Sequence, residues 1–421
     1  MNPIKVSEFP DFPSQNEIYE IVPNKSVIVG NTHRLFNKYP TRYIPQVPRW
    51  AILKYTSPGD IVLDPFCGSG TTLVEALLNG RNGLAIDIDP FARLLTSVKT
   101  TRYSAADIER IDQIVNKIKN NLTITASADA YPDIPNISKW FNEQAIDRLA
   151  VLKTLIDEYA VDRIAIKNYL YIVLAAIVRR CSNAENESPK PYISTRFPKV
   201  PEDPFIVFFE TESLYRNAII EFAKDTEDLK VSNTILSSND ARNIVLDSMV
   251  ELAVTSPPYI NAYDYVRILK FENMWLGLAD NKELVSLRKE YIGTEISSSF
   301  YTKYQYATQS ETLCSIMPTI ENVDRLRASM VGTYFEDMAL NLIQVRNVLV
   351  PGGRYVIVVG DSTIRNQNVP TTKILTEIAL ANGYEFETVF KYIIRDRYLH
   401  MPRGNRGGII KYDNILVLQK K

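Results

Sequence analysis

The sequence predicts an α/β fold in which a mostly parallel sheet carries helices on both faces. Short apolar runs of strand length alternate with stretches whose apolar residues recur at helical spacing. The first run, Ile61–Leu63, leads through a glycine turn into an apolar helical pattern that ends at Gly80, and a second run follows at 82–88. A strand, a helix and a second strand in this order predict neighbouring parallel strands.

Composition places the chain among globular proteins and limits the kinds of site that it can carry. With 421 residues, 45% of them hydrophobic, it is long enough for two or three domains. It lacks an apolar run of membrane-spanning length and a signal-peptide core, so we expect a cytoplasmic protein without a membrane partner. Its two histidines and three scattered cysteines show no metal-ligand spacing, so no metal is expected. Because the net charge is −1, any nucleic-acid site must be a local cluster.

The turn after the first strand is the first candidate ligand site. Gly68 and Gly70 flank Ser69, and Thr71 or Thr72 can cap the helix that follows. Glycines let the backbone approach a ligand, and the open amides of a first helical turn attract an anionic group. The third glycine of a dinucleotide fingerprint and the Gly-Lys-Ser/Thr of a P-loop are both missing. A nucleoside that carries a carboxylate therefore fits better than a pyrophosphate, and a plain strand–helix corner is the alternative.

Two further strand ends should face the same edge of the sheet. The second strand ends in acidic residues that include Asp87, at the distance expected of a ribose ligand. Far downstream, the apolar run 252–255 enters Ser-Pro-Pro-Tyr at 256–259, where the prolines halt the ladder and hold an extended exit. Ligands of open α/β sheets bind at the carboxyl ends of the strands. We therefore expect the oxygens of Ser256 and Pro257 to lie beside the glycine turn.

Together these motifs resemble those of the S-adenosylmethionine-dependent amino-methyltransferases of DNA. The motifs are Asp-Pro-Phe-Cys-Gly-Ser-Gly-Thr-Thr at 64–72 and Thr-Ser-Pro-Pro-Tyr at 255–259, and the likeness covers 33–104 and 236–421. Ser-Pro-Pro-Tyr resembles the variant typical of cytosine-N4 enzymes, whereas adenine-N6 enzymes more usually carry Asp- or Asn-Pro-Pro-Tyr. The resemblance implies a Rossmann-like class I methyltransferase with a seven-stranded sheet and S-adenosylmethionine as cofactor. It also implies double-stranded DNA as substrate and a restriction–modification system with a cognate restriction endonuclease.

The same resemblance implies roles for individual residues. The target amine would donate hydrogen bonds to Ser256 and to the carbonyl of Pro257, while Tyr259, after Pro258, stacks on a flipped-out base. The cofactor residues that it implies are His33, Asp64, Phe66, Gly68, Gly70, Thr71, Thr72, Asp87 and Asp240. Among these, Asp87 would bind the ribose and Asp240 the adenine amino group. Cys67 lies inside the cofactor turn, unlike the nucleophile of the carbon-5 cytosine enzymes.

Three parts of the chain are expected. Residues 1–104 form the lead-in, with a short strand at 26–29, and the cofactor half. Residues 105–231 form a helical insertion, which either contacts DNA outside the target base or has a structural or dimerising role. Residues 232–421 form the catalytic half, with a helical insert at 260–345. Two closing strands, at 384–394 and 414–418, are expected to pair antiparallel.

The connection between the two closing strands is the best candidate for phosphate contact. It is rich in glycine and contains Arg395, Arg397, Arg403, Arg406 and Lys411. A solvated loop is the alternative. Rival functions are adenine-N6 methylation of DNA, guanine-N2 methylation of RNA, and a silent DNA-binding subunit, against which the two intact motifs argue.

Overall fold

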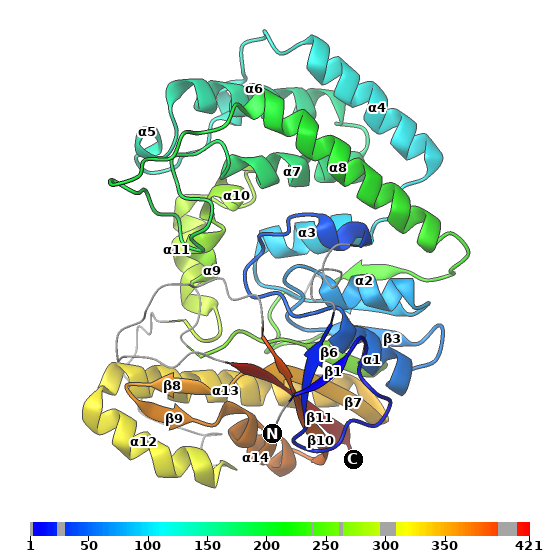
Figure 1. The fold of residues 1–421 in the computed structure, drawn as a ribbon, viewed down its shortest axis with the longest axis vertical. Helices are drawn as coiled ribbons and strands as arrows, with labels where there is room; N and C mark the ends of the chain where they lie inside the picture. The colour runs from blue at the N-terminus through cyan, green and yellow to red at the C-terminus, as the bar shows by residue number, and fades with distance from the viewer. Residues whose placement is uncertain (1–2, 23–29, 237–238, 261–263, 295–308, 395–410) are drawn as a thin grey trace.

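The computed structural model describes residues 3–22, 30–236, 239–260, 264–294, 309–394 and 411–421. A nine-stranded sheet forms the lower half of the molecule in Figure 1, and a body of helices lies above it. In spatial order the strands are β1 (Ile4–Val6), β2 (Ile18–Ile21), β10 (Tyr384–Ile393), β11 (Tyr412–Lys420), β7 (Leu349–Val359), β6 (Val250–Thr255), β3 (Ile61–Asp64), β4 (Asn82–Ala85) and β5 (Asn233–Ile235). A separate hairpin pairs β8 (Ser362–Ile364) with β9 (Gln367–Val369).

The sheet is mostly parallel, as predicted. Strands β5, β4, β3, β6 and β7 pair in parallel, and β11 is antiparallel to both β7 and β10. The expected antiparallel pair at the end of the chain is therefore confirmed.

The expected number of seven strands is too small for this sheet. The two additional strands, β1 and β2, come from the lead-in, where β2 pairs with the edge of β10 through Lys391 and Ile18. Prolines and polar residues make this segment look irregular in the sequence, but an open strand edge supplies the ladder partners that such short strands need. The strand expected at 26–29 lies outside the described residues.

Helices cover both faces of the sheet. They are α1 (Gln46–Tyr55), α2 (Thr71–Leu78), α3 (Pro90–Thr100), α12 (Glu311–Val323), α13 (Arg325–Val348) and α14 (Thr371–Ala381). Successive side chains of a strand point to opposite faces. Val356 and Val358 of β7 share a core with α1, while Tyr355 and Ile357 share one with α13 and α14, and all four are fully buried. Burial on both sides explains why this strand reads as a continuous apolar run.

The helical body draws on two separate stretches of the chain. It contains α4 (Ala105–Asn120), α5 (Ile137–Trp140), α6 (Glu143–Tyr159), α7 (Ile164–Val178), α8 (Pro204–Asp225), α9 (Tyr265–Ile268), α10 (Lys270–Trp275) and α11 (Asn281–Glu290). One hydrophobic cluster joins all of these except α5, whose Ile137 and Trp140 pack against it. Among these helices, α7 has the largest number of buried residues. Helices α9–α11 follow β6 in the chain, yet they pack with the helices that precede β5 (Figure 1). Among the described helices, none is long and apolar enough to cross a membrane.

The corner between β3 and α2 depends on glycine. Gly68 and Gly70 have φ angles of +47° and +77°, and Gly70 is the N-cap of α2, where a threonine cap was expected. A Cβ atom at Gly70 would lie 2.9 Å from Oγ1 and 3.2 Å from Cα of Thr96 in α3. Glycine is thus needed both for the turn and for the close approach of α3.

Gly70→Ala is expected to destabilise the protein more than Gly59→Ala. Both glycines have positive φ, so each substitution carries the left-handed penalty of about 1–2 kcal/mol. A Cβ at Gly59 meets nothing within 4 Å, whereas one at Gly70 meets α3 and adds about 1–3 kcal/mol of overpacking. Chemical denaturation gives the two free energies of unfolding, and equal losses would contradict the steric role of Gly70.

Candidate active site

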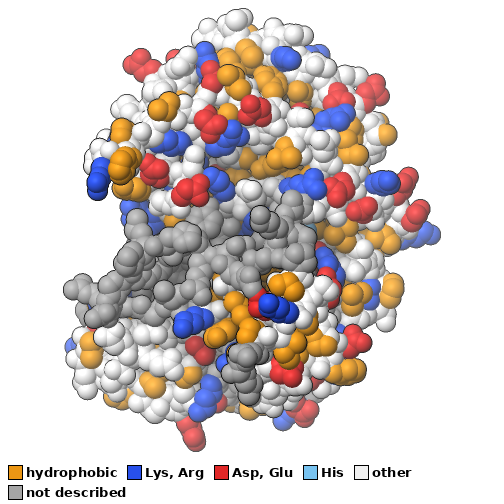
Figure 2. All heavy atoms as spheres, in the orientation of Figure 1, with side chains coloured by type: hydrophobic (Ala, Val, Ile, Leu, Met, Phe, Trp, Pro, Cys, Tyr) orange, Lys and Arg blue, Asp and Glu red, His pale blue; other side chains and the backbone are white. Residues whose placement is uncertain are grey.

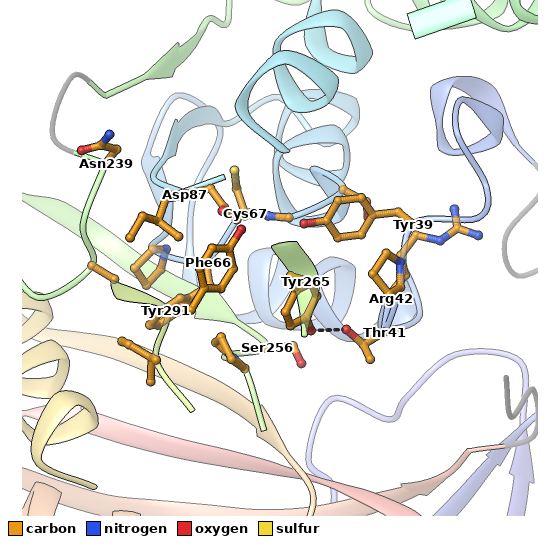
Figure 3. A pocket seen from close by; sticks show the side chains of 18 of the residues that line it. Tyr39, Thr41, Arg42, Phe66, Cys67, Asp87, Asn239, Ser256, Tyr265 and Tyr291 are labelled. Atoms are coloured by element: carbon orange, nitrogen blue, oxygen red, sulfur yellow. Dashed lines mark hydrogen bonds between the residues drawn. The ribbon is translucent and has the colours of Figure 1, made fainter. Parts of the chain in front are cut away.

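A cavity lies at the carboxyl edge of the sheet, where ligands of open α/β sheets bind (Figure 3). Among the described residues, its lining comes from the segments 39–43, 65–69, 87–88, 239–242 and 290–292, together with Thr71, Ser256, Pro258 and Tyr265. Chain segments more than 200 residues apart therefore meet in one space.

The cavity brings together parts of both predicted motifs. Of the predicted site residues, Phe66, Gly68, Thr71, Asp87, Asp240, Ser256 and Pro258 line it. In Figure 3, Phe66 and Asp87 from the first half of the chain border the same space as Ser256. Parallel pairing of β3 with β4 and with β6 produces this arrangement, since it aligns the three strand ends.

His33 lies outside the lining. Its buried Nε2 is 2.9 Å from Oε1 of Glu75 in α2, and Glu75 also accepts hydrogen bonds from the guanidinium of Arg49 in α1. Burial lowers the pKa of His33 and outweighs its acidic neighbour. This network ties the short helix η2 (Asn31–Arg34) to α1 and α2 beneath the segment 39–43.

Asp64 and Thr72 also lie outside the lining, and they join the two motifs. The Asp64 carboxylate is fully buried and accepts a hydrogen bond of 2.6 Å from Oγ1 of Thr255, which directly precedes Ser256. The hydroxyl of Thr72 donates to its other oxygen. Burial raises the pKa of Asp64 to about 6, and these hydrogen bonds limit the rise.

Asp87 presents a half-buried carboxylate to the cavity. Its Oδ2 accepts the N–H of Gly68 at 2.8 Å, and its Oδ1 accepts the N–H of Asp89 at 2.9 Å. Burial nevertheless raises the pKa of Asp87 to about 7. Burial also raises the pKa of the neighbouring Cys67 thiol well above its ordinary range, so this cysteine is a neutral, weakly nucleophilic group.

Asp240 is held by an arginine for which the sequence predicted no role. Nε and Nη2 of Arg242 donate to the two oxygens of Asp240 at 2.9 and 2.8 Å, and Nη1 donates to Asp337 at 3.0 Å. Burial raises the pKa of Asp240, but the Arg242 guanidinium outweighs burial and leaves that pKa below its usual value. The cavity therefore carries an ionised, oriented carboxylate at this end.

Aromatic side chains from the helical body border the cavity opposite the strand ends. The rings of Tyr265 and Tyr291 stack, with centroids 6.0 Å apart and an interplanar angle of 14°. The phenol of Tyr291 donates to Asp89 at 2.6 Å, and the hydroxyl of Tyr265 is hydrogen-bonded to Thr41 (Figure 3). Neither tyrosine lies in a strand-end motif, so no sequence pattern indicated that they belong to the site.

The remaining predicted residues have other positions. Gly70 forms the turn, Pro257 is buried, and Tyr259 lies outside the lining with its hydroxyl 2.7 Å from Asp413. Arg395, Arg397, Arg403 and Arg406 lie outside the described residues. Lys411 is exposed and directly precedes β11. Within the described ranges, no three His, Cys, Asp or Glu side chains form a group that could hold a metal ion.

The sequence is similar to those of known proteins, in the region of the glycine turn and, for some of them, over most of the chain. A family model described as DNA methylase matches residues 10–96, which contain the glycine turn and Asp87. Type II methyltransferase M.MvaI from Kocuria varians is 27% identical over 396 residues, or 89% of this chain and 86% of that protein. Type II methyltransferase M.BsoBI from Geobacillus stearothermophilus is 22% identical over 419 residues, or 86% of this chain and 81% of that protein.

A shorter part of the chain is similar in sequence to an enzyme that modifies tRNA. The tRNA (guanine(10)-N2)-dimethyltransferase of Methanocaldococcus jannaschii is 35% identical over 92 residues, or 20% of this chain and 26% of that protein. The DNA methylase family match supports S-adenosylmethionine as the cofactor. Together with the two similarities that span most of the chain, it supports a DNA methyltransferase of the restriction–modification kind.

Proposed function

We propose that the protein transfers a methyl group from S-adenosylmethionine to the exocyclic N4 amine of cytosine in DNA. The observation that carries this proposal is the position of Ser256, which lines the same cavity as Gly68 and Asp87. A group able to accept a hydrogen bond from an amine thus faces a cavity whose other walls suit a nucleoside. Full-length similarity to type II methyltransferases supports DNA as the substrate and a restriction–modification system, with a cognate endonuclease, as the setting.

The polar groups that line the cavity fit S-adenosylmethionine. Gly68 and Thr71, in the turn and the first helical residue, would hold the amino-acid end. Asp87 would accept hydrogen bonds from the ribose hydroxyls, and Asp240 would lie near the adenine amino group. The bound cofactor supplies an electrophilic methyl group.

The protein's own residues would act mainly by positioning the amine that accepts the methyl group. The Ser256 oxygen and the Pro257 carbonyl would accept the two amine hydrogens, which fixes the nitrogen and draws its lone pair out of conjugation with the base. Tyr265 and Tyr291 would shield the reacting groups from water. A strong base is not required before transfer, because the neutral amine is the nucleophile.

DNA is proposed to bind through local contacts. On the face shown in Figure 2, acidic and basic side chains are interspersed over the helical body. We therefore assign phosphate contact to the arginine-rich connection 395–411 rather than to a broad basic surface. The helical insertion 105–231 would contact the duplex outside the target base, in a protein that acts in the cytoplasm.

Two other acceptors remain candidates for specific reasons. Adenine N6 is also an exocyclic amine, and the Ser256 and Pro257 oxygens can accept hydrogen bonds from either base. Guanine N2 of RNA is favoured only by the 92-residue similarity to the tRNA enzyme.

Nucleosides from the DNA of cells that express the protein are expected to contain N4-methylcytosine. Mass spectrometry of the digested DNA measures it, with the Ser256→Ala, Tyr259→Ala double variant as the inactive control. N6-methyladenine in place of N4-methylcytosine would retain the fold and cofactor site but refute the choice of base. If a folded, cofactor-binding protein leaves DNA unmodified, DNA as substrate is wrong and RNA is tested next.

Cofactor affinity is expected to rise with pH near neutrality through Asp87. Burial raises the pKa of Asp87 to about 7, and only the ionised carboxylate is a full acceptor for two ribose hydroxyls. Asp87→Asn should weaken binding about tenfold near pH 8 and about twofold near pH 6. Isothermal titration calorimetry of the wild-type protein and of Asp87→Asn gives the two dissociation constants of the cofactor at each pH. Their ratio cancels the effect of protonation of the cofactor itself. A ratio independent of pH would contradict the assignment of Asp87 to the ribose.

A further inference from the structure

We propose that the segment 290–293 is a wall against which the nucleoside half of S-adenosylmethionine binds, with Tyr291 as a cofactor-binding residue and Asp89 as the residue that positions it. This inference rests on the proposed function and deepens it, because it adds a subsite to the cofactor site. The wall segment begins at the last residue of α11 and belongs to none of the motifs. Glu290, Tyr291 and Ile292 line the cavity.

Asp89 joins the wall segment to the strand end that carries Asp87. It is 1% exposed, and its Oδ2 accepts the phenol proton of Tyr291 at 2.6 Å. Its Oδ1 accepts the N–H of Phe91 at the start of α3 and an amide N–H of Asn273 in α10, at 2.8 and 3.2 Å. The backbone N–H of Asp89 donates to Oδ1 of Asp87 at 2.9 Å. One carboxylate therefore holds Tyr291 close to the residue proposed for the ribose.

Arg242 holds the first residue of the wall segment. Its Nη2 donates to the backbone carbonyl of Glu290 at 3.0 Å, and its Nε and Nη2 donate to Asp240 at 2.9 and 2.8 Å. Glu290 and Tyr291 are thus each hydrogen-bonded to a residue that contacts one of the carboxylates proposed for the nucleoside. Since Asp87 and Asp240 line the same cavity, the wall segment extends from the ribose end of the proposed site to its adenine end.

The wall segment receives little support from its own helix. Within α11, only Leu284 is buried. Beyond the helix, Ile292 is buried in the core that α13 shares with the sheet. Gly293 has a φ angle of +76°, and a Cβ atom there would lie 3.0 Å from the carbonyl oxygen of Tyr259, next to the end of β6. The position of the wall segment therefore depends on its contacts with the strand ends more than on α11.

The groups that the wall presents suit a purine nucleoside. In Figure 3, Tyr291 and Asp87 border the same space. An aromatic ring and the side chain of Ile292 match the flat face of a purine, whereas the carboxylates match its amino group and the ribose hydroxyls. Because Asp89 holds the phenol, the ring occupies its binding position before the cofactor arrives. Holding a binding group in place in advance reduces the entropy lost on binding.

A double-mutant cycle on the binding of S-adenosylhomocysteine, the demethylated cofactor, tests this arrangement. Tyr291→Phe keeps the ring but removes its hydrogen bond, and we expect the dissociation constant to rise about fivefold. Asp89→Ser keeps a cap for the N–H of Phe91 but is too short to reach Tyr291, and it should weaken binding at least as much. In the Tyr291→Phe background, the effect of Asp89→Ser should be about threefold smaller or less. Loss of the Asp89 charge beside Asp87 occurs in both backgrounds and cancels from this comparison.

Tyr384→Phe is the matched control. Tyr384 lies in β10, is fully buried, and donates its hydroxyl proton to the carbonyl of Leu342 at 2.8 Å, outside the cavity lining. Its substitution removes one buried phenol hydrogen bond and should leave the dissociation constant unchanged. Equal effects of Asp89→Ser in both backgrounds, or a loss of affinity from Tyr384→Phe as large as that from Tyr291→Phe, would overturn the proposal.

A spectroscopic measurement tests the contact itself. In protein labelled with ¹³C at the tyrosine Cε atoms, the Tyr291 signal is assigned by its loss in Tyr291→Phe, and the Tyr384 signal by its loss in Tyr384→Phe. Saturating S-adenosylhomocysteine is expected to shift the Tyr291 signal, through the ring current of the adenine, and to leave the Tyr384 signal in place. An unmoved Tyr291 signal overturns the inference. A shift caused by methionine and not by adenosine would assign the wall segment to the amino-acid end and overturn it as well.

These outcomes are separate from the choice of base. A protein that methylates cytosine with an unmoved Tyr291 signal retains the proposed function and refutes this inference. A shifted signal and coupled variants in a protein that leaves DNA unmodified refute the proposed function alone, and a folded protein that does not bind S-adenosylhomocysteine refutes both. Should Asp89→Ser fail to fold, Tyr291→Phe decides alone, since wild-type affinity in that variant refutes the role of its hydrogen bond.

Discussion

The site depends on the buried carboxylate of Asp64, which joins two motifs that lie far apart in the chain. It accepts a hydrogen bond from Thr255, 191 residues away, and another from Thr72 at the start of α2. The parallel pairing of β3 with β6 brings these groups to one edge, and the carboxylate fixes their relative position. Desolvation raises the pKa of Asp64 to about 6, so the hydrogen bonds only partly offset the cost of burying its charge. The glycine turn and the Ser-Pro-Pro-Tyr motif are thereby joined at one edge of the sheet.

The cavity above this edge is completed by parts of the chain that do not belong to the sheet. The lead-in contributes the segment 39–43, and the helical body contributes Tyr265 and Tyr291. The hydrogen bond between Thr41 and Tyr265 connects these two contributions directly. The helical body is therefore more than an insertion beside the site, because packing in its core sets where two of the lining side chains lie.

The sequence predicted the position of a residue correctly where that residue directly follows a strand. Gly68, Asp87 and Ser256 each follow a short apolar run, and the edge rule for parallel sheets then places them together. Tyr291 and Arg242 line the same cavity, but helix packing and ion pairing place them there, and neither leaves a periodic or motif signal. Strands β1 and β2 were missed for a related reason, since their stability comes from the neighbouring β10 and not from their own composition.

The proposed roles of Ser256 and Pro257 also bear on base selection. The Ser256 hydroxyl oxygen lines the cavity and can accept a hydrogen bond, and the Pro257 carbonyl is an acceptor by nature. Cytosine N4 and adenine N6 both present two amine hydrogens, so this arrangement favours an exocyclic amine without distinguishing the bases. Discrimination must therefore come from groups that contact the ring, where a purine and a pyrimidine differ in size and in their other edge atoms. In the proposed mechanism, a serine at the first position of the motif supplies an acceptor for an exocyclic amine, and the groups that contact the ring complete the selection of the base.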